Sequence, residues 1–265
     1  MKIATYNVNS INARLENLTA WLTEAAPDVV LVQEIKSEYN NFPFFELRAA
    51  GYNAQILGQK SYNGVAVLSK TPVKVTCEGL PGFADANARY LEAEIKHNDQ
   101  SWRVASIYLP NGNPPYNNAE DDSKYLYKQQ WMDALLRHAE TLQKLPQPVI
   151  LGGDFNVILT DNDVYDPKRF VGNALTRPEV RQKLTALGHL GFYDAFRTLH
   201  PDSSGYTFWD YAGNSLNADF GMRIDYLFLN APAADRLLSC TVDKTPRRAG
   251  KPSDHTVLIA EFRND

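Results

Sequence analysis

The stretch Asp28-Val29-Val30-Leu31-Val32-Gln33-Glu34 is a short apolar run that ends in a carboxylate. A continuous run of this length is typical of a strand that is buried on both faces. Burying an unpaired carboxylate costs several kcal/mol, so an acid beside such a strand usually faces a cleft, a cation or a proton partner. Polar residues border further apolar runs at Ile3 to Asn7, Val149 to Asp154, Ile224 to Asp225, and Asp254-His255 before Val257. The pattern predicts a metal-assisted active site built from several strand ends.

Strands outnumber helices in the predicted secondary structure. Strands are predicted at residues 2–8, 29–33, 64–69, 90–96, 102–108, 149–152, 206–210, 224–229 and 256–262. Helices are predicted at residues 11–22, after an Asn9 or Ser10 cap and before Pro27, at 121–143, and after Thr176, where Glu179 completes a capping box and Gly188 marks the end. Helices interspersed among many strands favour an α/β fold of four layers, with two packed mixed β-sheets flanked by helices.

Length and composition limit the class of protein. The chain has 265 residues, of which 44% are hydrophobic, and we expect a single domain over residues 1–265. The turn-rich stretch Leu109–Asn118 is interpreted as a surface loop rather than a domain boundary. There is neither a signal peptide at the start nor an apolar run of the ~18 residues that a membrane span needs. We therefore expect no membrane association.

Cysteine usage and charge narrow the setting further. The two cysteines, Cys77 and Cys240, lie far apart in sequence and form no zinc-binding pattern, so a reducing cytoplasm is predicted. The net charge of −4 argues against nucleic-acid binding by bulk positive charge. A local basic patch on an acidic body can nevertheless bind phosphate.

Three candidate catalytic elements stand at these strand ends. Glu34 is the first predicted metal ligand, because Mg²⁺ is typically held by one or two carboxylates and keeps several waters. Asp154 and Asn156 are two residues apart in an extended segment, so their side chains point the same way, although an Asx turn would also explain the pair. His255 can change charge near pH 7, and Asp225 would orient its imidazole. The remaining histidines lack this acidic context and are interpreted as structural: His97, His138, His189 and His200.

Six short motifs, in order, give the chain a family resemblance. They are Tyr6-Asn7-Val8-Asn9-Ser10, Leu31-Val32-Gln33-Glu34-Ile35-Lys36, Tyr62-Asn63-Gly64-Val65-Ala66, Gly153-Asp154-Phe155-Asn156, Arg223-Ile224-Asp225-Tyr226 and Lys251-Pro252-Ser253-Asp254-His255. Together they resemble the bacterial exonuclease III family, the Mg²⁺-dependent apurinic/apyrimidinic (AP) endonucleases of the endonuclease/exonuclease/phosphatase superfamily. The resemblance extends from Met1 to Phe262. It implies a DNA repair nuclease that hydrolyses the phosphodiester 5′ to an abasic site and removes 3′-blocking groups or nucleotides.

The resemblance implies a set of metal ligands. Glu34 is expected to be the main Mg²⁺ ligand, with Asn7 nearby and Asp254 contributing. Mn²⁺ is expected to substitute for Mg²⁺. Whether the site takes one ion or two stays open, the ligands of the second being Asp154, Asn156 and His255.

Catalytic roles follow from the same resemblance. Asp154 is expected to activate the attacking water or to protonate the leaving oxygen, and Asn156 to orient it. His255, with Asp225, is expected to contact the scissile phosphate, and Tyr108 to support the phosphate or the leaving group. In-line hydrolysis needs such an arrangement, with a nucleophilic water on one side and a stabilised alkoxide on the other.

The stretch Tyr206-Thr207-Phe208-Trp209-Asp210-Tyr211, with Met222, resembles the wall of a pocket for a flipped-out abasic deoxyribose. Such a wall would accept a sugar without a base and would refuse an intact nucleotide. Phe208 and Trp209 are predicted to line the pocket, while about half of these residues are expected to lie in the core, as is common for aromatic strands. Thr207-Phe208-Trp209-Asp210-Tyr211 departs from the family pattern, which leaves the balance of endonuclease and exonuclease activity open.

Basic residues are expected to contact the DNA backbone. By the resemblance these include Arg89 and Lys124. The cluster Lys244, Arg247, Arg248 and Lys251 contains no acid and is either a backbone-binding patch or a solvated loop. The expected partner is double-stranded DNA with abasic sites or blocked 3′ ends, bound by a monomer.

Two alternatives remain at this point. The same fold and metal could hydrolyse an inositol phosphate or a sphingolipid head group, since this fold carries different substrate rims. Alternatively, the chain could be a catalytically silent DNA-binding module, although each expected catalytic position is filled.

Overall fold

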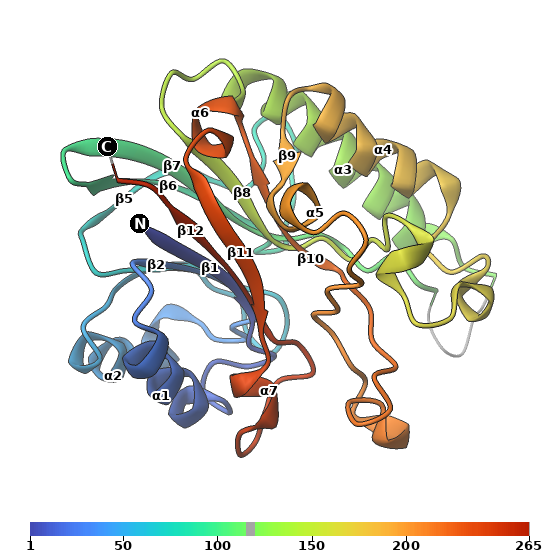
Figure 1. The fold of residues 1–265 in the computed structure, drawn as a ribbon, viewed down its shortest axis with the longest axis horizontal. Coiled ribbons are helices and arrows are strands. Elements are labelled where there is room, and N and C mark those ends of the chain that lie inside the picture. Colours follow the sequence, from blue (N-terminus) through green and yellow to red (C-terminus); the bar gives the residue numbers. More distant parts are fainter. Residues whose placement is uncertain (115–119, 265) are drawn as a thin grey trace.

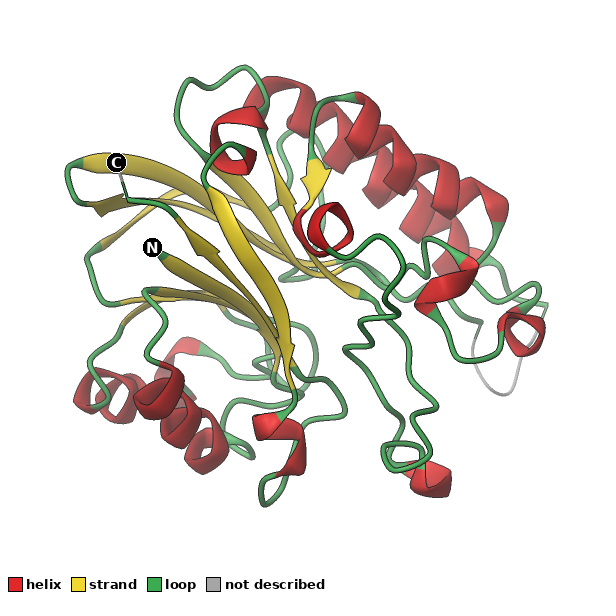
Figure 2. Ribbon diagram, in the orientation of Figure 1, coloured by secondary structure: helices red, strands yellow, loops and turns green. Residues whose placement is uncertain are grey.

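The computed structural model describes residues 1–114 and 120–264 and consists of two β-sheets packed face to face between helices (Figures 1 and 2). The predicted turn cluster Leu109–Asn118 therefore lies partly outside the described residues. In each sheet the described part contains six strands, and both parallel and antiparallel pairs occur. The α/β sandwich of four layers predicted from the sequence is confirmed.

The first sheet joins the two ends of the chain. Its strand order is β11-β12-β1-β2-β4-β3. β1 is parallel to β2 and antiparallel to β12, so the amino-terminal strand lies at the centre. The bounds are β1 Lys2–Asn7, β2 Val29–Gln33, β3 Asn53–Leu57, β4 Val65–Ser69, β11 Leu237–Asp243 and β12 Val257–Phe262.

The second sheet comes from the middle of the chain, in the order β5-β6-β7-β8-β10-β9. β8 is parallel to β7 and antiparallel to β10, a register that pairs Asp154 with Asp225. The bounds are β5 Val73–Glu78, β6 Tyr90–His97, β7 Gln100–Tyr108, β8 Val149–Asp154, β9 Tyr193–Asp194 and β10 Asp225–Leu229.

Helices cover the outer face of each sheet (Figure 1). On the first sheet these are α1 Leu15–Ala25, α2 Phe44–Ala49 and the short α7 Thr245–Arg248. On the second sheet they are α3 Ser123–Leu142 and α4 Pro178–His189. Shorter pieces are α5 Ala195–Leu199 and α6 Ala231–Ala234, and the 3₁₀ turns Tyr39–Asn41, Asp161–Asp163, Pro167–Phe170 and Ala212–Asn214.

Alternating residues of the central strands serve two cores. In β2, Leu31 packs between the sheets, whereas Val30 and Val32 pack under α1 and α2. Because successive side chains of a strand point to opposite faces, a strand between two apolar layers must be apolar throughout, as the sequence of β2 is. The polar residues that follow such strands therefore lie at the strand ends, where the apolar layers stop.

Three local predictions were wrong. Helix α1 begins at Leu15 rather than after Asn9 or Ser10, because the Ser10 amide instead donates to the Glu34 carbonyl at 2.7 Å. Thr176 does not cap α4, since its hydroxyl donates to the carbonyls of Phe170 and Asn173. Residues 206–210 do not form a regular strand. Within that stretch, Phe208 makes isolated bridges to Met222 and His255, and both of these partners lie outside the regular strands.

Candidate active site

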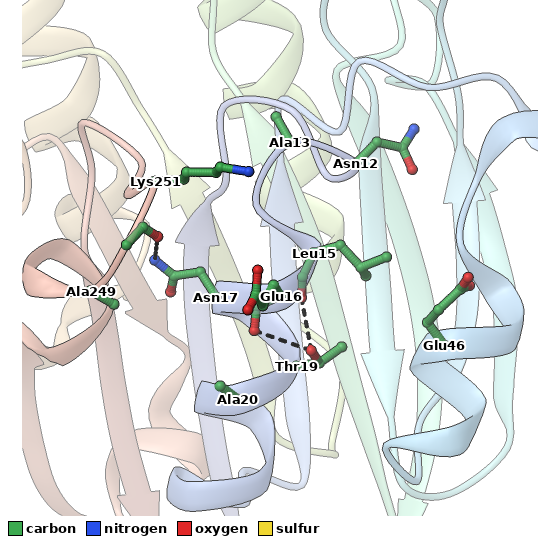
Figure 3. A pocket seen from close by; sticks show the side chains of 11 residues that line it. Asn12, Ala13, Leu15, Glu16, Asn17, Thr19, Ala20, Glu46, Ala249 and Lys251 are labelled. Carbon is green, nitrogen blue, oxygen red and sulfur yellow. Dashed lines mark hydrogen bonds between the residues drawn. The ribbon is translucent and has the colours of Figure 1, made fainter.

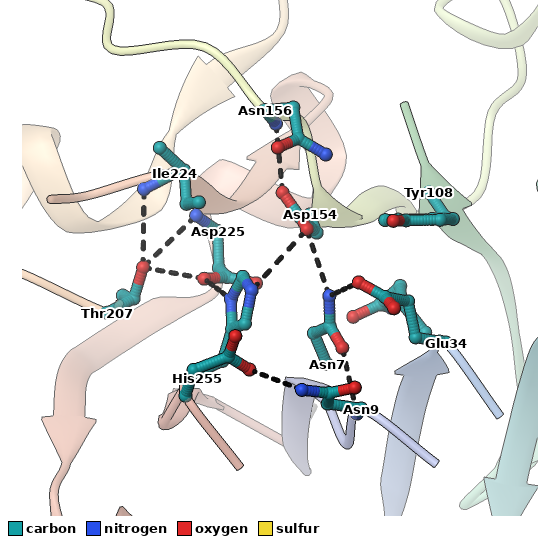
Figure 4. A network of polar contacts seen from close by, with 12 residues as sticks. Asn7, Asn9, Glu34, Tyr108, Asp154, Asn156, Thr207, Ile224, Asp225 and His255 are labelled. Atoms are coloured by element: carbon teal, nitrogen blue, oxygen red, sulfur yellow. Dashed lines mark hydrogen bonds and ion pairs between the residues drawn. The ribbon is translucent and has the colours of Figure 1, made fainter. Parts of the chain in front are cut away.

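The ends of β1, β2 and β8 and the start of β10 meet at one edge of the two sheets (Figure 4). Asn7 and Asp154 are the last residues of β1 and β8, Asp225 is the first of β10, and Glu34 directly follows β2. Gly153 makes the approach of β8 to β7 feasible, because a Cβ at this position would lie 1.9 Å from the Ile107 carbonyl oxygen. Residues remote in sequence thus converge as predicted.

Asn7 connects the two sheets through its side chain. Its fully buried amide nitrogen donates to Glu34 Oε1 at 2.9 Å and to Asp154 Oδ2 at 3.0 Å. Its oxygen accepts from the Asn9 amide at 3.0 Å, which fixes which end of the amide faces the carboxylates. One side chain therefore sets the spacing between a carboxylate of each sheet.

Asp225 and His255 form the predicted carboxylate–imidazole pair. Asp225 Oδ2 lies 2.8 Å from His255 Nδ1 and accepts the Thr207 hydroxyl at 2.6 Å. On the other side of the ring, His255 Nε2 lies 3.7 Å from Asp154 Oδ2. The imidazole is therefore held between two carboxylates, with Nε2 facing the centre of the site.

The buried charges shift one another's proton affinities. Burial raises the pKa of Asp154 to about 7; His255 opposes this rise, and the carboxylates of Asp225 and Glu34 add to it. Burial disfavours the imidazolium of His255, but Asp225 and Asp154 outweigh burial and raise its pKa to about 10. The surroundings therefore favour the cationic form of His255, and Asp154 holds a proton more readily than an ordinary aspartate.

Glu34 stays ionised for a different reason. Burial opposes its charge, but the hydrogen bond from Asn7 and the ammonium of Lys36, 2.9 Å from Oε2, lower its pKa. Tyr108, at the end of β7, contacts Glu34 from the other side. Burial, together with the charges of Glu34 and Asp154, raises the pKa of the Tyr108 hydroxyl well above its ordinary value, so this group remains a proton donor.

This donor set suits a divalent metal ion. One ligand atom each of Glu34, Asp154 and His255 lies within 4.8 Å of the others, the one such group among the described residues. Burial is the main cause of the raised pKa of Asp154, and repulsion from the carboxylates of Asp225 and Glu34 adds to it. A divalent cation between the oxygens would relieve that repulsion, so the residues fit a metal ion.

Asp254 lies outside this group of ligands. Its Oδ1 accepts from the Asn9 amide nitrogen at 3.1 Å, and the Asn9 oxygen in turn accepts from Lys36 Nζ at 2.6 Å. Asp254 therefore reaches the Glu34 side of the cluster through Asn9 and Lys36. Its role as a metal ligand stays a prediction.

Asn156 is anchored by residues that the sequence analysis did not identify. Its side-chain nitrogen donates to the Leu109 carbonyl at 2.9 Å, and its oxygen accepts from Asn111 at 3.1 Å. The ammonium of the fully buried Lys128 donates to the main-chain carbonyls of Asn156, Asn111 and Ala174 at 2.6, 3.0 and 3.0 Å. Three loops around the site are thus joined at one lysine.

A pocket of about 510 Å³ opens beside His255, and Phe208 and Met222 are among the residues that line it. Phe208 packs edge-on against His255, with ring centroids 5.0 Å apart. Trp209, predicted as the second aromatic of the wall, is instead fully buried, and its indole nitrogen donates to Asp219 at 3.1 Å. The prediction for Trp209 was wrong because alternate residues of this extended segment face opposite sides.

The predicted DNA-contacting cations differ in their surroundings. The Arg89 guanidinium lies 4.7 Å from the centre of the Tyr108 ring, next to the site, and Lys124 is exposed near the start of α3. In the Lys244–Lys251 cluster, Arg247 is buried and donates to the Trp209 carbonyl at 3.0 Å, so that residue is structural. Lys251 lines a separate hollow of about 670 Å³ beside α1, which contains none of the catalytic candidates (Figure 3).

Two of the residues missed in the sequence carry a recognisable signal. Lys128 lies three residues after Tyr125 and four before Met132, on the buried stripe of α3, where a lysine is unusual. Thr207 precedes Phe208 in the aromatic stretch, and its hydroxyl accepts the amides of Ile224 and Asp225 at 3.2 Å. Asn9 and Lys36 lie within the quoted motifs, but no spacing rule indicates that they meet.

Comparison with known proteins agrees with this geometry. A family model described as the endonuclease/exonuclease/phosphatase family matches residues 4–255. Exodeoxyribonuclease III of Haemophilus influenzae is 29% identical over 271 residues, covering 99% of this chain and 100% of that protein. An AP endonuclease structure from Archaeoglobus fulgidus superimposes with a TM-score of 0.91 at 32% identity, covering 100% of both chains. The structure of the 3′ phosphatase NExo from Neisseria, bound to a product DNA hairpin, superimposes with a TM-score of 0.91 at 33% identity, covering 100% of both chains.

In the described part of the chain, no helix is long and apolar enough to cross a membrane.

Proposed function

This chain belongs to the endonuclease/exonuclease/phosphatase family, and we propose on that premise that it is a metal-dependent DNA repair nuclease. It hydrolyses the phosphodiester 5′ to an abasic site and removes 3′-blocking groups or nucleotides. The observation that carries the proposal is the meeting of Glu34, Asp154 and His255 within 4.8 Å, beside a pocket walled by Phe208. The names of the full-length relatives, an exodeoxyribonuclease III and an AP endonuclease, support DNA as the substrate.

We assign proton transfer to Asp154. A buried carboxylate whose pKa is about 7 can take a proton from the attacking water at neutral pH and return one to the leaving 3′ oxygen. The Asn156 main-chain amide donates to Asp154 Oδ1 at 2.9 Å, and Asn7 donates to Oδ2, so both oxygens are fixed in direction. The Asp154 carboxylate is thus held in one orientation.

Stabilisation of the phosphate falls to His255 and Tyr108. The imidazolium, oriented by Asp225, presents Nε2–H to the site, and Tyr108 presents a hydroxyl that stays protonated. Both are donors aimed at oxygens that gain negative charge in the transition state. A bound divalent cation would supply further positive charge to the same oxygens.

The cation is proposed to be a single Mg²⁺, with Mn²⁺ as a substitute. Glu34 and Asp154 would provide the hard oxygen ligands that Mg²⁺ prefers. A second ion held by Asp154, Asn156 and His255 would require His255 to lose a proton, because a protonated imidazole offers no lone pair to a metal.

Backbone contacts are proposed for Arg89, Lys124, Lys244, Arg248 and Lys251, acting on duplex DNA from a monomer. Arg89 next to Tyr108 is the cation best placed to bind a phosphate adjoining the scissile one. The single-domain organisation and the cytoplasmic location remain predictions from the sequence.

The proposal is tested with a duplex that carries one synthetic abasic site. The enzyme in Mg²⁺ is expected to nick it once, on the 5′ side, leaving a 3′ hydroxyl, and EDTA is expected to stop the reaction. An inositol phosphate is assayed in parallel. Hydrolysis of that compound alone would favour the non-nucleic-acid alternative, and duplex binding without any cleavage would favour the silent module.

A further inference from the structure

The pocket beside the catalytic residues has a volume of about 510 Å³ and mixed polar and aromatic walls. At one end it is walled by Phe208, which packs on His255, and by Asn111, whose amide binds Asn156. These two contacts place one end of the pocket beside His255 and Asn156. Leu175 adds an apolar side chain to the lining, and behind it lies a small apolar cluster with Ile158, Val164 and Ile224.

An aromatic pair forms the far end of the same pocket. The rings of Tyr165 and Phe220 are stacked, with centroids 4.8 Å apart and planes 24° apart. Main-chain contacts hold the pair beside the Phe208 wall, because the Tyr165 amide donates to Gly221 and Val164 bridges to Met222. Phe220 is nevertheless 47% exposed, so Tyr165 covers one side of its ring while much of the remainder stays open.

We propose that Tyr165 and Phe220 form a stacking platform for the base of the 3′-terminal nucleotide, so that this pocket takes an intact nucleoside and not only an abasic sugar. The sugar lies between Phe208 and Asn111, and the base lies on Phe220. A deoxyribose alone has no ring to stack there, whereas every base has a π face. The volume of about 510 Å³ falls within the ~300–1,000 Å³ of small-molecule sites.

This inference rests on the proposed function and specifies its substrate. In nucleotide removal, the water oxygen bonds to phosphorus and the bond from phosphorus to the upstream 3′ oxygen breaks. That oxygen takes a proton, and the departing nucleotide keeps the phosphate on its own 5′ oxygen. The group downstream of the reacting phosphate is a nucleoside for a normal 3′ end, a bare sugar at an abasic site, and absent for a 3′-phosphate. The three substrates therefore share the chemistry and differ in how far they fill the pocket.

The test compares Phe220→Ala and Tyr165→Ala with the wild type on these three duplexes. A matched control is Phe45→Ala, since Phe45 is 81% exposed on α2, on the outer side of the first sheet. Loss of one stacking contact is expected to lower the ratio of kcat/KM for nucleotide removal to kcat/KM for 3′-phosphate removal by roughly 5- to 100-fold. Phe220→Trp is expected to restore the ratio, and Phe45→Ala to leave it within twofold of the wild type.

A second readout does not depend on turnover. In an Asp154→Asn background, a duplex with 2-aminopurine at its 3′ end is expected to change its fluorescence on binding, and Phe220→Ala to remove much of that change. Equal losses on all three substrates, or an unchanged ratio, would overturn the platform. Failure of the wild type to process the 3′-phosphate and the abasic duplex would instead overturn the proposed function.

Discussion

Replacing Lys128 with methionine isolates the contribution of the buried ammonium from that of the packed side chain. Methionine keeps a similar length and apolar stem but cannot donate to the carbonyls of Asn111, Asn156 and Ala174. Two opposing terms then decide the stability of the variant. Burial lowers the pKa of Lys128 from 10.5 to about 7, which corresponds to a cost of about 5 kcal/mol for the charged form.

Methionine removes that cost but leaves three buried carbonyl groups without this donor, at about 1–3 kcal/mol each. Because the two terms oppose each other, the free energy of unfolding is expected to change by less than about 4 kcal/mol. Activity should respond more strongly. Asn156 loses its main-chain anchor, and loss of a supporting contact of this kind typically lowers activity about 10- to 100-fold.

The assays are urea unfolding followed by circular dichroism, and single-turnover cleavage of an abasic duplex with enzyme in excess. Lys183→Met is the matched control, because Lys183 joins α4 to Gln129 and Asp133 of α3 without touching the site. A folded Lys128→Met enzyme that cleaves within twofold of the wild type would refute the reasoning. So would a Lys183→Met variant with the same loss of activity.

Four further substitutions test other parts of the site and fold. Asp154→Asn should lower single-turnover cleavage roughly 10²- to 10⁴-fold while DNA affinity, measured by fluorescence anisotropy, stays within a few fold; an unfolded variant would instead mean a structural role. Phe208→Ala should lower abasic incision more than 3′-phosphate removal, and equal losses would argue against a sugar pocket. Trp209→Ala should mainly destabilise the fold, lowering the free energy of unfolding measured in urea by about 3–5 kcal/mol, because Trp209 is fully buried. Glu92→Gln tests the pH dependence of stability: burial opposes the Glu92 charge, but its hydrogen-bond donors lower its pKa from 4.5 to about 2. This stabilisation, about 3 kcal/mol, is present above pH 4.5 and is lost as the pH falls toward 2, so the gap between wild type and variant should shrink between pH 7 and pH 3; a constant gap would contradict it.

The predictable part of the fold comes from strands that lie between two apolar layers. Val29–Gln33 and Val149–Asp154 are fully buried, so their sequences are apolar throughout and their polar ends stand out. Edge and half-buried strands carry no such signal. β3 and β5 are the outermost strands of their sheets and are only partly buried, and both were missed along with β11 and α2.

The residues of the candidate site could likewise be predicted only where they border a buried strand. Glu34, Asp154 and His255 each border a buried strand, and their meeting follows from the order of strand ends. The position of Lys128 on the buried stripe of α3 indicates a special role, but no residue spacing encodes its hydrogen bonds to the main chain of Asn111, Asn156 and Ala174, or those of Thr207 to Ile224 and Asp225. Trp209 was misplaced because an aromatic residue one position from the pocket wall has the same composition signal as one in it.

The proposed role of Glu34 as ligand of the catalytic cation can be measured through the dependence of abasic-duplex cleavage on Mg²⁺ concentration. Glu34→Gln is compared with the wild type and with Glu46→Gln, a change at an exposed glutamate on α2. Glu34→Gln is expected to need at least ~10-fold more Mg²⁺ for half-maximal rate, or to be inactive, while Glu46→Gln follows the wild-type curve. If the Glu34→Gln curve coincides with that of the wild type, Glu34 does not hold the cation.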